Sequence, residues 1–528
     1  MSDNPVSLRQ LPRLPLRELG QLGTLLRPGT HRSPLLDLGK RFVVSAPGLP
    51  KMLITHDMDD VREVFTNHDD FSVGQVLSRL SSHDRMFGKQ VLIFLDGDAH
   101  RRERKLFSPP FQSKALKSYE ELMVEVVRRE VPTWPLDEPF EFLKVGYDLA
   151  IGVLLGVVFG DVAPERRDRL KDAIAAWFGE IESRGFLAVT LLTPLFGGYT
   201  PPYPPLNRRR DEVDVVILEE IAARRAAPAE AGRRDVLSRY INTDLDQHDD
   251  PALARNMRGV LLGAYETTAI TLGWIAAMLA GHPEAMAEVD AADDADDQPR
   301  LDAYLDAVVA ETMRLRPVSP FTGRRALRDT VVNGVRIPKG AIVIVPILLI
   351  HESEEHYKDP LTFRPERFLD ERPNGHTWLT FGAGPHRCLG AQFALAEARI
   401  LFRTVLEQRR IVPTPGTLEP PRRYHTASVP PTTPASPCCR VNGARMPRPD
   451  QEAGRSQARV RSSRQASQRS RRVYGSRLNA DCTTGRRACS AGGGSWRRNC
   501  STGSGSGFGA AGGGVPGRSA PLRLPWRS

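Results

Sequence analysis

The chain has 528 residues, enough for one large domain or for two to three ordinary ones, and its 40% of hydrophobic and 26% of charged residues are usual for a globular protein. Its net charge of +10 is concentrated at the C-terminal end, where residues 441–528 contain 17 arginines, no lysine and three acidic residues. Residues 1–440 therefore carry a net charge of −4, which argues against a polyanion-binding role for this larger part of the chain.

The first hundred residues contain few strong secondary-structure signals. Residues 1–35 are rich in Pro, Leu and Arg and predict an extended lead-in, without the continuous apolar run of a signal peptide. The pattern RFVVSAPGLPKML at 41–53 predicts two short strands around a Pro-Gly turn, and residues 56–65 predict a short helix. Residues 71–97, with weak periodicity and many Ser, Asp and Gly, predict a long loop of the kind that often serves function.

Helical periodicity dominates from residue 99 to about 226, apart from the turn-rich stretch TPLFGGYTPPYPP at 193–205. The apolar run at 259–280 then has about the length of a membrane span. Because it carries Glu266 and threonines and lies deep inside the chain, we expect a buried helix that crosses a large core. A carboxyl group in such a helix requires a functional reason or a partner.

The remaining body of the chain mixes helices with short strands, and no internal repeat is visible. We therefore expect a mainly α fold with small β-sheets. The expected elements are, in order, an acidic loop at 290–297, a helix at 301–315, strands around the Asn-Gly turn of VVNGVRI, an apolar strand in AIVIVPILLI, an irregular segment at 359–372 and a last helix at about 389–408.

From about residue 441 the composition changes to Arg, Ser and Gly without periodicity. Such a segment buries too little apolar surface to offset its loss of conformational entropy, so we expect 441–528 to be a disordered, low-complexity tail. Its abrupt start also resembles an out-of-frame translation of GC-rich DNA. Arginine-rich tails do bind polyanions, which leaves nucleic-acid binding by the tail as a competing interpretation, although regularly interleaved aromatic residues are absent.

The cysteines divide as the charges do. Five of the six lie at or beyond position 438, so residues 1–437 contain Cys388 alone. A domain of this size with one cysteine has no internal disulfide, which fits a reducing cytoplasm. An isolated cysteine is most often a small buried apolar residue, so the surrounding residues must decide its role.

Cys388 lies in the glycine-rich segment Phe381-Gly-Ala-Gly-Pro-His-Arg-Cys-Leu-Gly390, just before the last predicted helix. Exposed backbone N–H groups and the positive end of the helix dipole predict a lowered thiol pKa. Glycines such as Gly382 and Gly390 let the backbone pass close to a flat ligand. A zinc site is disfavoured, because no second Cys and no paired His lies nearby at ligand spacing.

This ten-residue segment resembles, position by position, the cysteine loop of the cytochrome P450 family, and the resemblance extends over roughly residues 41–430. It implies a haem domain at 36–440 with the family's triangular helical prism, haem b as the cofactor and Cys388 as the thiolate ligand of the iron. It also implies that His386, two residues before the cysteine, supports a haem propionate.

Other segments resemble the family in the same order along the chain. Glu311 and Arg314, in YLDAVVAETMRLRP, match its Glu-x-x-Arg helix, and Arg367 in FRPERF matches the arginine that completes a buried network. In GAYETT, the resemblance implies that Glu266 supplies protons for O–O cleavage and that Thr267 hydrogen-bonds dioxygen, within a bulge of the helix. Ala264 departs from the pattern, because the family usually has glycine there, and its methyl group narrows the oxygen pocket.

Three further cations match the family's propionate contacts. These are His100 and Arg104, which an i, i+4 spacing places on one helix face, and Arg324, five residues before Asp329. Each alone is typical of a solvated surface charge, but their common order favours propionate binding.

The resemblance implies a monooxygenase that inserts one atom of O₂ into an apolar small molecule such as a lipid, steroid, terpenoid or polyketide. No flavin or nicotinamide fingerprint is present, so a separate ferredoxin or flavodoxin with its reductase is implied, docking near Arg387, Arg399 and Arg403. The competing interpretation within the family, a haem enzyme that isomerises or reduces, conflicts with the acid–threonine pair. The segments expected to set specificity are the 72–95 loop, the 185–205 segment, the helix face from Leu261 to Thr268, Val318 to Gly323 and the turn near Ala427. Their apolar residues include Phe186, Leu187, Leu192, Phe196, Val318 and Phe321.

Overall fold

A computed structural model describes residues 5–15, 34–45, 50–76, 90–135, 139–192, 201–226, 233, 235–242, 249–412, 422–424, 427–429 and 439–442. The chain divides into two units, Met1–Met446 and Pro447–Ser528. The expectations for the second unit, for residues 16–33 and for Phe196 lie outside the described residues.

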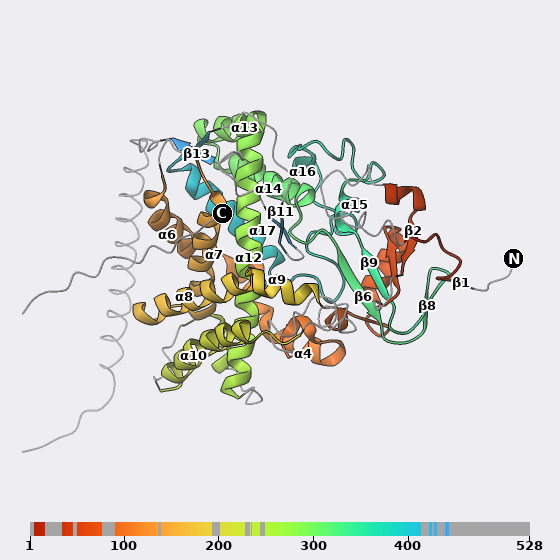
Figure 1. The fold of residues 1–528 in the computed structure, drawn as a ribbon. Coiled ribbons are helices and arrows are strands. Elements are labelled where there is room, and N and C mark those ends of the chain that lie inside the picture. The colour runs from red at the N-terminus through yellow and green to blue at the C-terminus, as the bar shows by residue number, and fades with distance from the viewer. Residues whose placement is uncertain are drawn as a thin grey trace, which may run out of the picture. The chain divides into compact units, whose positions relative to one another are not determined.

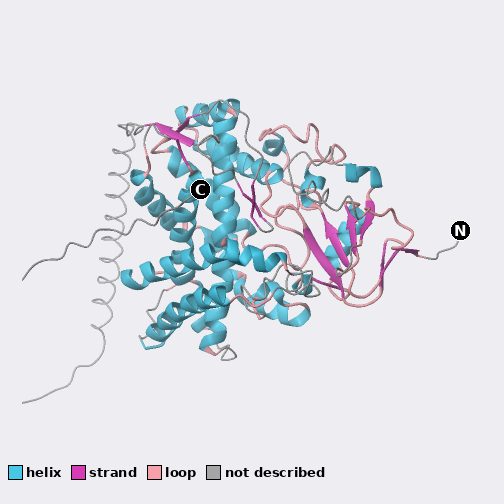
Figure 2. Ribbon diagram, viewed as in Figure 1, coloured by secondary structure: helices cyan, strands magenta, loops and turns pink. Residues whose placement is uncertain are grey.

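The fold of the first unit is mainly helical with small β-sheets, as the sequence predicts (Figure 2). The strands of the largest sheet gather at one side of this unit and the long helices at the other (Figure 1). The helices of eight or more residues are α1 (Met58–Thr66), α4 (Gly97–Phe107), α6 (Glu120–Glu130), α7 (Phe142–Phe159), α8 (Pro164–Ile181), α9 (Arg184–Leu191), α10 (Pro204–Ala226), α12 (Asp250–Gly281), α13 (Pro283–Asp294), α14 (Gln298–Leu315) and α17 (Ala391–Leu406). Shorter helices are α5 (Ser113–Leu116), α11 (Val236–Ile241), α15 (Ile347–His351) and α16 (Arg367–Asp370).

The five-stranded sheet has the strand order β2-β3-β9-β6-β4 and mixes parallel and antiparallel pairs. Its hydrophobic residues alternate between two clusters: Ile342 and Ile344 of β9 pack on one face, and Val343 packs on the other. The strands are β2 (Arg41–Val44), β3 (Met52–Thr55), β4 (Phe71–Ser72), β6 (Thr322–Ala326) and β9 (Ile342–Val345).

Three smaller sheets complete the β structure. β1 (Val6–Ser7) joins the hairpin of β7 (Thr330–Val332) and β8 (Val335–Ile337), so residues expected to form a lead-in add a parallel strand there. The other two sheets are β10-β13-β5, formed by Arg410–Val412, Cys439–Asn442 and Pro139–Phe140, and the pair β11 (Arg422–Tyr424) and β12 (Ala427–Val429).

The main core forms where the central helix α12 packs against α7 and α10. Local sequence sets both ends of α12: Asp249 caps it by accepting a hydrogen bond from the Ala252 amide, and Gly281 precedes His282-Pro283. α7 and α12 are the two described helices that are long and apolar enough to cross a membrane, and both are mostly buried within the fold. This burial agrees with the expectation that 259–280 belongs to a core helix.

Two predicted elements are wrong. The acidic stretch at 290–297 is not a loop, since α13 continues to Asp294; Met286, Val289 and Ala292 lie on one buried face, and this packing outweighs the low helix propensity of Asp. The run AIVIVPILLI is not one strand, because Pro346 lacks the N–H that would continue the ladder, and α15 begins at Ile347.

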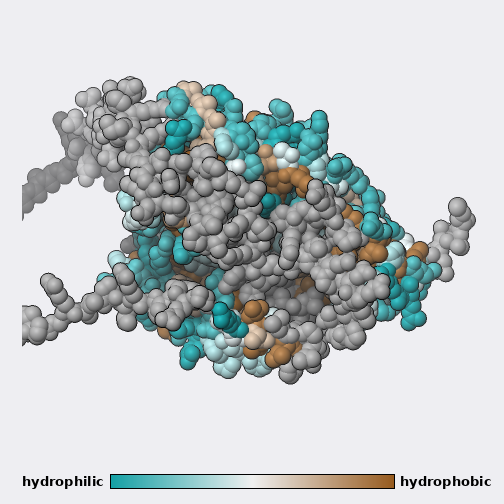
Figure 3. Space-filling view, turned by 45° about the horizontal axis from the view of Figure 1, so that its top comes forward, coloured by the Kyte–Doolittle hydropathy of each residue, from teal (hydrophilic) through white to brown (hydrophobic). Residues whose placement is uncertain are grey.

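Where its residues are described, the face of the molecule in Figure 3 is mainly hydrophilic, with apolar patches among the hydrophilic residues. The exposed large apolar side chains include Leu187 and Leu192 near α9 and Ile93 before α4. They belong to segments that the sequence predicts to set specificity.

Candidate active site

Cys388 lies in a turn three residues before α17, the helix whose N-cap is Gly390. Its amide donates to the carbonyl of Phe381 at 2.9 Å, which closes the loop on itself. The loop needs its glycines: Gly382 and Gly384 have φ values of +66° and +70°, and a Cβ at Gly384 would lie 2.1 Å from the Phe65 carbonyl oxygen. Cys388 remains accessible to solvent at the end of this tight turn.

The thiol of Cys388 has a raised pKa, which corrects the prediction of a lowered one. Although Cys388 keeps accessible surface, the dense protein around its sulfur desolvates the thiolate and raises this pKa, which outweighs the opposing effects of the Gly390 amide, Arg387 and Arg104. The helix terminus alone therefore does not ionise the sulfur. A thiolate at this position requires a further positive charge, which a metal ion supplies when it displaces the proton.

Open space is found beside the middle of α12. Gly263 and Thr267, one turn apart, are exposed although the helix buries most of its neighbouring residues. A Cβ built on Gly263 meets no atom within 4 Å. The helix thus presents one uncovered strip inside the main core, with Ala264 partly buried beside it.

Glu266 and Thr267 follow each other on this part of α12. Burial raises the pKa of Glu266 to about 7, with a smaller contribution from Glu182. The Thr267 hydroxyl donates to the carbonyl of Gly263 at 2.9 Å. α12 is continuous from Asp250 to Gly281, so the expected bulge in the helix is not observed. A carboxyl group that titrates near neutral pH suits proton transfer.

The four predicted propionate-binding cations include a close histidine pair. The rings of His100, on α4, and His386, in the cysteine loop, stack with centroids 3.9 Å apart. Burial, helped by the nearby His386 and Arg104, lowers the pKa of His100 to about 4, so His100 is neutral at pH 7. Burial also lowers the pKa of Arg104, while Cys388 is the largest influence that raises it, which places this cation near the sulfur.

Arg324 is buried without a matching carboxylate. Within the described residues its guanidinium donates to the Thr322 hydroxyl and the Gly323 carbonyl, and it forms no ion pair there. Burial lowers the pKa of Arg324 to about 10, and the charge of Asp96, which makes no ion pair with it, opposes this lowering. A buried guanidinium with spare donors fits an anionic group that the protein itself does not provide.

Asp96 lies among these cations and was not predicted. Its carboxylate accepts from the Ser72 hydroxyl and from the Val73 amide, and lies 3.5 Å from Nε2 of His386. Asp96 directly precedes α4, and its sequence Asp-Gly-Asp is typical of a helix start. This pattern does not indicate a contact with the cysteine loop. The contact depends on tertiary structure alone.

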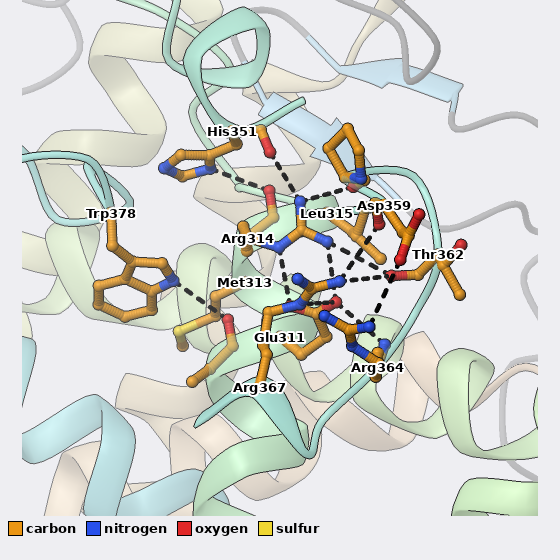
Figure 4. Close-up of polar contacts among 12 residues, drawn as sticks. Glu311, Met313, Arg314, Leu315, His351, Asp359, Thr362, Arg364, Arg367 and Trp378 are labelled. Carbon is orange, nitrogen blue, oxygen red and sulfur yellow. Dashed lines mark hydrogen bonds and ion pairs between the residues drawn. The ribbon is translucent and has the colours of Figure 1, made fainter. Parts of the chain in front are cut away.

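The structure brings Glu311, Arg314 and Arg367 together in a buried network (Figure 4). The Glu311 carboxylate accepts from Nε and Nη2 of Arg314 at 2.7 and 2.8 Å, and from Nε of Arg367 at 3.0 Å. It also accepts from the Arg364 amide at 3.0 Å. Glu311 and the Arg314 side chain have no accessible surface, so both charges depend on this pairing.

Two arginines expected to meet a redox partner are already paired. Arg399 contacts Asp302 at 2.8 Å and Asp306 at 3.2 Å, and Arg403 contacts Asp302 and Glu120. Their charges are therefore balanced within the fold, and their part in partner docking stays a prediction. Arg387 is exposed and makes no ion pair with any described residue.

Two buried groups near the site also went unpredicted. Glu397, on α17, is almost completely buried; burial raises its pKa to about 8, against the effect of a hydrogen bond with Thr268 of α12. His351, at the end of α15, has no accessible surface and joins α14 to the cysteine loop. Neither residue lies in a motif, and an acid in an apolar helix was the only signal for Glu397.

The residues predicted to set specificity fall into two groups. Leu261 and Phe186 are buried, and Val318 and Phe321 are half-buried. Leu187 and Leu192 are exposed, by 50% and 43%, which leaves apolar surface available next to α9.

These residues fit a haem group. The cysteine loop offers one accessible sulfur, Arg324 and Arg104 offer buried or half-buried positive charge for carboxylates, and α12 leaves an open strip. Among the described residues no cluster of three or more His, Cys, Asp or Glu could hold a metal ion alone. An iron bound by this site thus depends on one protein ligand and on the ligand atoms of a porphyrin.

Comparisons with known proteins agree with this arrangement. The family model for cytochrome P450 matches residues 40–438. The chain is 32% identical over 378 residues to cytochrome P450 137 of Mycobacterium tuberculosis, which covers 71% of this chain and 75% of that protein. It is 32% identical over 401 residues to cytochrome P450 135B1 of Mycobacterium bovis, covering 74% and 83%.

Solved structures share the fold. Retinoic acid-bound cyanobacterial CYP120A1 superposes with a TM-score of 0.64 at 22% identity, over 81% of this chain and 99% of that one. CYP175A1 from Thermus thermophilus gives a TM-score of 0.59 at 21% identity, over 82% and 100%.

Proposed function

Since the chain belongs to the cytochrome P450 family and is a haem monooxygenase, we propose that Cys388 binds the iron and that the enzyme oxygenates an apolar small molecule with electrons from a separate protein. The observation that carries this proposal is the accessible Cys388 sulfur at the end of a glycine-bracketed turn before α17. We assign the haem domain to residues 36–440.

Haem b, bound through a cysteine thiolate, supplies the iron at which dioxygen is activated. The chain's own residues hold and orient it. Cys388 donates its sulfur to the iron, while Arg324, Arg104, His386 and His100 provide donors for the two propionates. Arg324 has the strongest reason to do so, because its buried charge lacks a carboxylate partner among the described residues.

Glu266 and Thr267 are proposed to deliver protons. With a pKa of about 7, Glu266 is partly protonated at neutral pH, so it can both release a proton and be recharged from solvent. Thr267 now donates to the Gly263 carbonyl on an exposed strip of the helix, and the same hydroxyl can turn to pass a proton to an oxygen in the open space. The acid–hydroxyl pair argues for oxygenation rather than isomerisation.

The proposed substrate is apolar. Phe186, Val318 and Phe321 belong to segments expected near the substrate, and Leu187, Leu192 and Ile93 add exposed apolar surface. Burial of such surface is the main source of affinity for lipid, steroid, terpenoid or polyketide-like molecules. Cyanobacterial CYP120A1, which shares the fold, was solved with retinoic acid bound.

Electrons are proposed to come from a ferredoxin or flavodoxin with its reductase, because the sequence contains no flavin or nicotinamide fingerprint. Exposed Arg387, directly beside Cys388, is the positive charge that remains available to an acidic partner. The single cysteine in residues 1–437 supports a cytoplasmic location.

The test is the carbon monoxide difference spectrum of the reduced protein. Thiolate ligation gives a red-shifted Soret band that histidine ligation does not give. We expect this band from the intact protein and its loss from Cys388→Ala. Absence of the band from intact haem-loaded protein, or its survival in Cys388→Ala, would overturn the assignment.

A further inference from the structure

Two of the last four carbonyls of α14 are bound by residues from elsewhere in the chain. The last four carbonyls of a helix have no partner within it. Here those of Thr312 and Leu315 accept from the amide and the side chain of Arg316 at 2.7 and 2.9 Å. The carbonyl of Met313 accepts from the Thr380 hydroxyl at 3.0 Å, and that of Arg314 contacts Nδ1 of His351 at 2.9 Å.

His351 makes a second bond on the opposite side of its ring. Its Nε2 accepts from the Leu379 amide at 2.8 Å. A backbone amide only donates and a carbonyl only accepts, so the ring must carry its hydrogen on Nδ1 and be neutral. Complete burial lowers the pKa of His351 to about 3, which agrees with the neutral form.

Leu379 lies two residues before Phe381, the first residue of the cysteine loop. Its carbonyl accepts from the Gly382 amide at 2.8 Å, and the neighbouring Phe381 carbonyl accepts from the Cys388 amide at 2.9 Å. Trp378 adds a bond from its indole N–H to the carbonyl of Ala310 at 3.1 Å. Three consecutive residues, 378–380, are therefore bound to the last turns of α14 or to His351, which itself contacts the last turn of α14. Figure 4 shows the contacts of Trp378 and of His351 with α14.

His351 is also bound by the buried ion network. Nη1 of Arg314 donates to the His351 carbonyl at 2.6 Å, while His351 bonds the Arg314 carbonyl in return. This reciprocal pair connects Glu311 and Arg314 with the backbone of the cysteine loop through a single side chain. The sequence alone does not indicate these contacts, because His351 lies 37 residues from Arg314 and 28 residues from Leu379 along the chain.

We propose that His351 is a positioning residue of the haem-thiolate centre, which fixes the loop bearing Cys388 to α14 through its neutral Nδ1–H tautomer. The inference rests on the proposed role of Cys388 as the iron ligand. Removing the ring nitrogens takes this partner from the Leu379 amide, just before the loop, and from the Arg314 carbonyl in the last turn of α14. The loop then samples other positions, and the sulfur loses the geometry in which it remains a thiolate.

The test compares His351→Phe, which keeps a ring but no nitrogen, with Tyr304→Phe as a matched control. Tyr304, a residue of α14, is buried like His351 of α15, and its hydroxyl donates to Glu366 at 2.8 Å. In the reduced, carbon monoxide-bound state, we expect the red-shifted band of His351→Phe to convert to a shorter-wavelength form about tenfold or more faster than that of the parent. Tyr304→Phe should keep the parent rate.

His351→Gln tests the tautomer argument. Its amide presents one donor and one acceptor, so it should recover part of the band lifetime that His351→Phe loses. Hydrogen exchange gives a second readout, since the Leu379 amide should exchange faster in His351→Phe and at the parent rate in Tyr304→Phe.

Equal band lifetimes and equal Leu379 exchange in His351→Phe and Tyr304→Phe would overturn the proposal. Should His351→Phe fail to fold, His351→Asn, which is too short to reach both partners, decides in the same way. Retention of the red-shifted band by Cys388→Ala is a separate result, which would refute the proposed ligand rather than the role of His351.

Discussion

Replacing Glu311 by Gln tests how far the buried network stabilises the fold. The substitution keeps the shape of the side chain but removes the charge that faces two guanidinium groups. Four hydrogen bonds of 2.7 to 3.0 Å converge on this carboxylate, and its surroundings exclude water. A glutamine offers one oxygen in place of two and turns an N–H₂ group towards donors.

The expected loss follows from the burial of the pair. An ion pair at about 4 Å is worth about 4 kcal/mol at an effective dielectric constant of about 20, and much of this offsets desolvation of the charges. Breaking a buried pair by removing one partner costs about 3–5 kcal/mol, because the other charge remains buried. Since Arg314 has no accessible side-chain surface, Glu311→Gln should reach this range, a large part of the about 5–15 kcal/mol that stabilises a domain.

The assay is urea unfolding of the haem-bound protein, followed by tryptophan fluorescence. Glu219→Gln serves as the matched control, because Glu219 also forms a two-bond pair with an arginine, Arg169, at 2.6 and 2.9 Å, but on the surface. Solvent screens that pair, so its loss should barely move the unfolding midpoint. Equal midpoints for the two variants would refute the reasoning that burial, not bond geometry, sets the contribution.

Four other outcomes are expected. The oxygenation rate should fall as pH rises above about 7, where Glu266 loses its proton, and Glu266→Gln should be slower and nearly independent of pH between 6 and 8 in turnover assays; an unchanged profile would contradict proton delivery by this residue. Folding raises the pKa of Glu397 from 4.5 to about 8, so the folded protein binds one more proton than the unfolded chain between these two pH values. The free energy of unfolding should therefore fall as pH rises from about 4.5 to about 8, by up to about 1.4 kcal/mol per pH unit. Urea midpoints should depend less on pH in Glu397→Gln. Arg324→Met should stabilise the haem-free protein by about 1–3 kcal/mol, because it removes a buried charge, and should weaken haem binding in a titration; a destabilised apoprotein would count against an unpaired Arg324. Deletion of residues 445–528 should leave the carbon monoxide spectrum intact, and loss of haem from a cleanly expressed truncation would show that the tail contributes to the haem domain.

Much of the fold could be predicted because its signals are local. The helices that became α12, α14 and α17 are marked by apolar periodicity and by breaks at Gly, Asn and Pro, which act within a few residues. The errors arose where packing outweighed local signals. Buried Met286, Val289 and Ala292 extend α13 through a run of aspartates, and the strand after Ala341 ends at Pro346 although apolar residues continue.

The candidate site divides in the same way. Cys388, the Glu311/Arg314 pair and the Glu266-Thr267 pair could be predicted, because each is a short pattern whose spacing places the groups side by side. The raised pKa of Cys388 could not be predicted, since desolvation by the dense protein around its sulfur outweighs the helix terminus. Asp96 and His351 carry no local signal, because their partners lie in other elements.

The sequence by itself determined which chemistry is possible: a lone cysteine in a glycine-bracketed loop, an acid–hydroxyl pair in an apolar helix and a Glu-x-x-Arg spacing. These depend on neighbours along the chain, which covalent geometry fixes. Only the tertiary structure decided which charges are paired. It paired Arg399 and Arg403 with acidic residues, left Arg324 buried without one and placed His351 between α14 and the cysteine loop. Burial and long-range contacts set these outcomes, because the energy of a charge or a hydrogen bond depends on how much water the rest of the fold excludes.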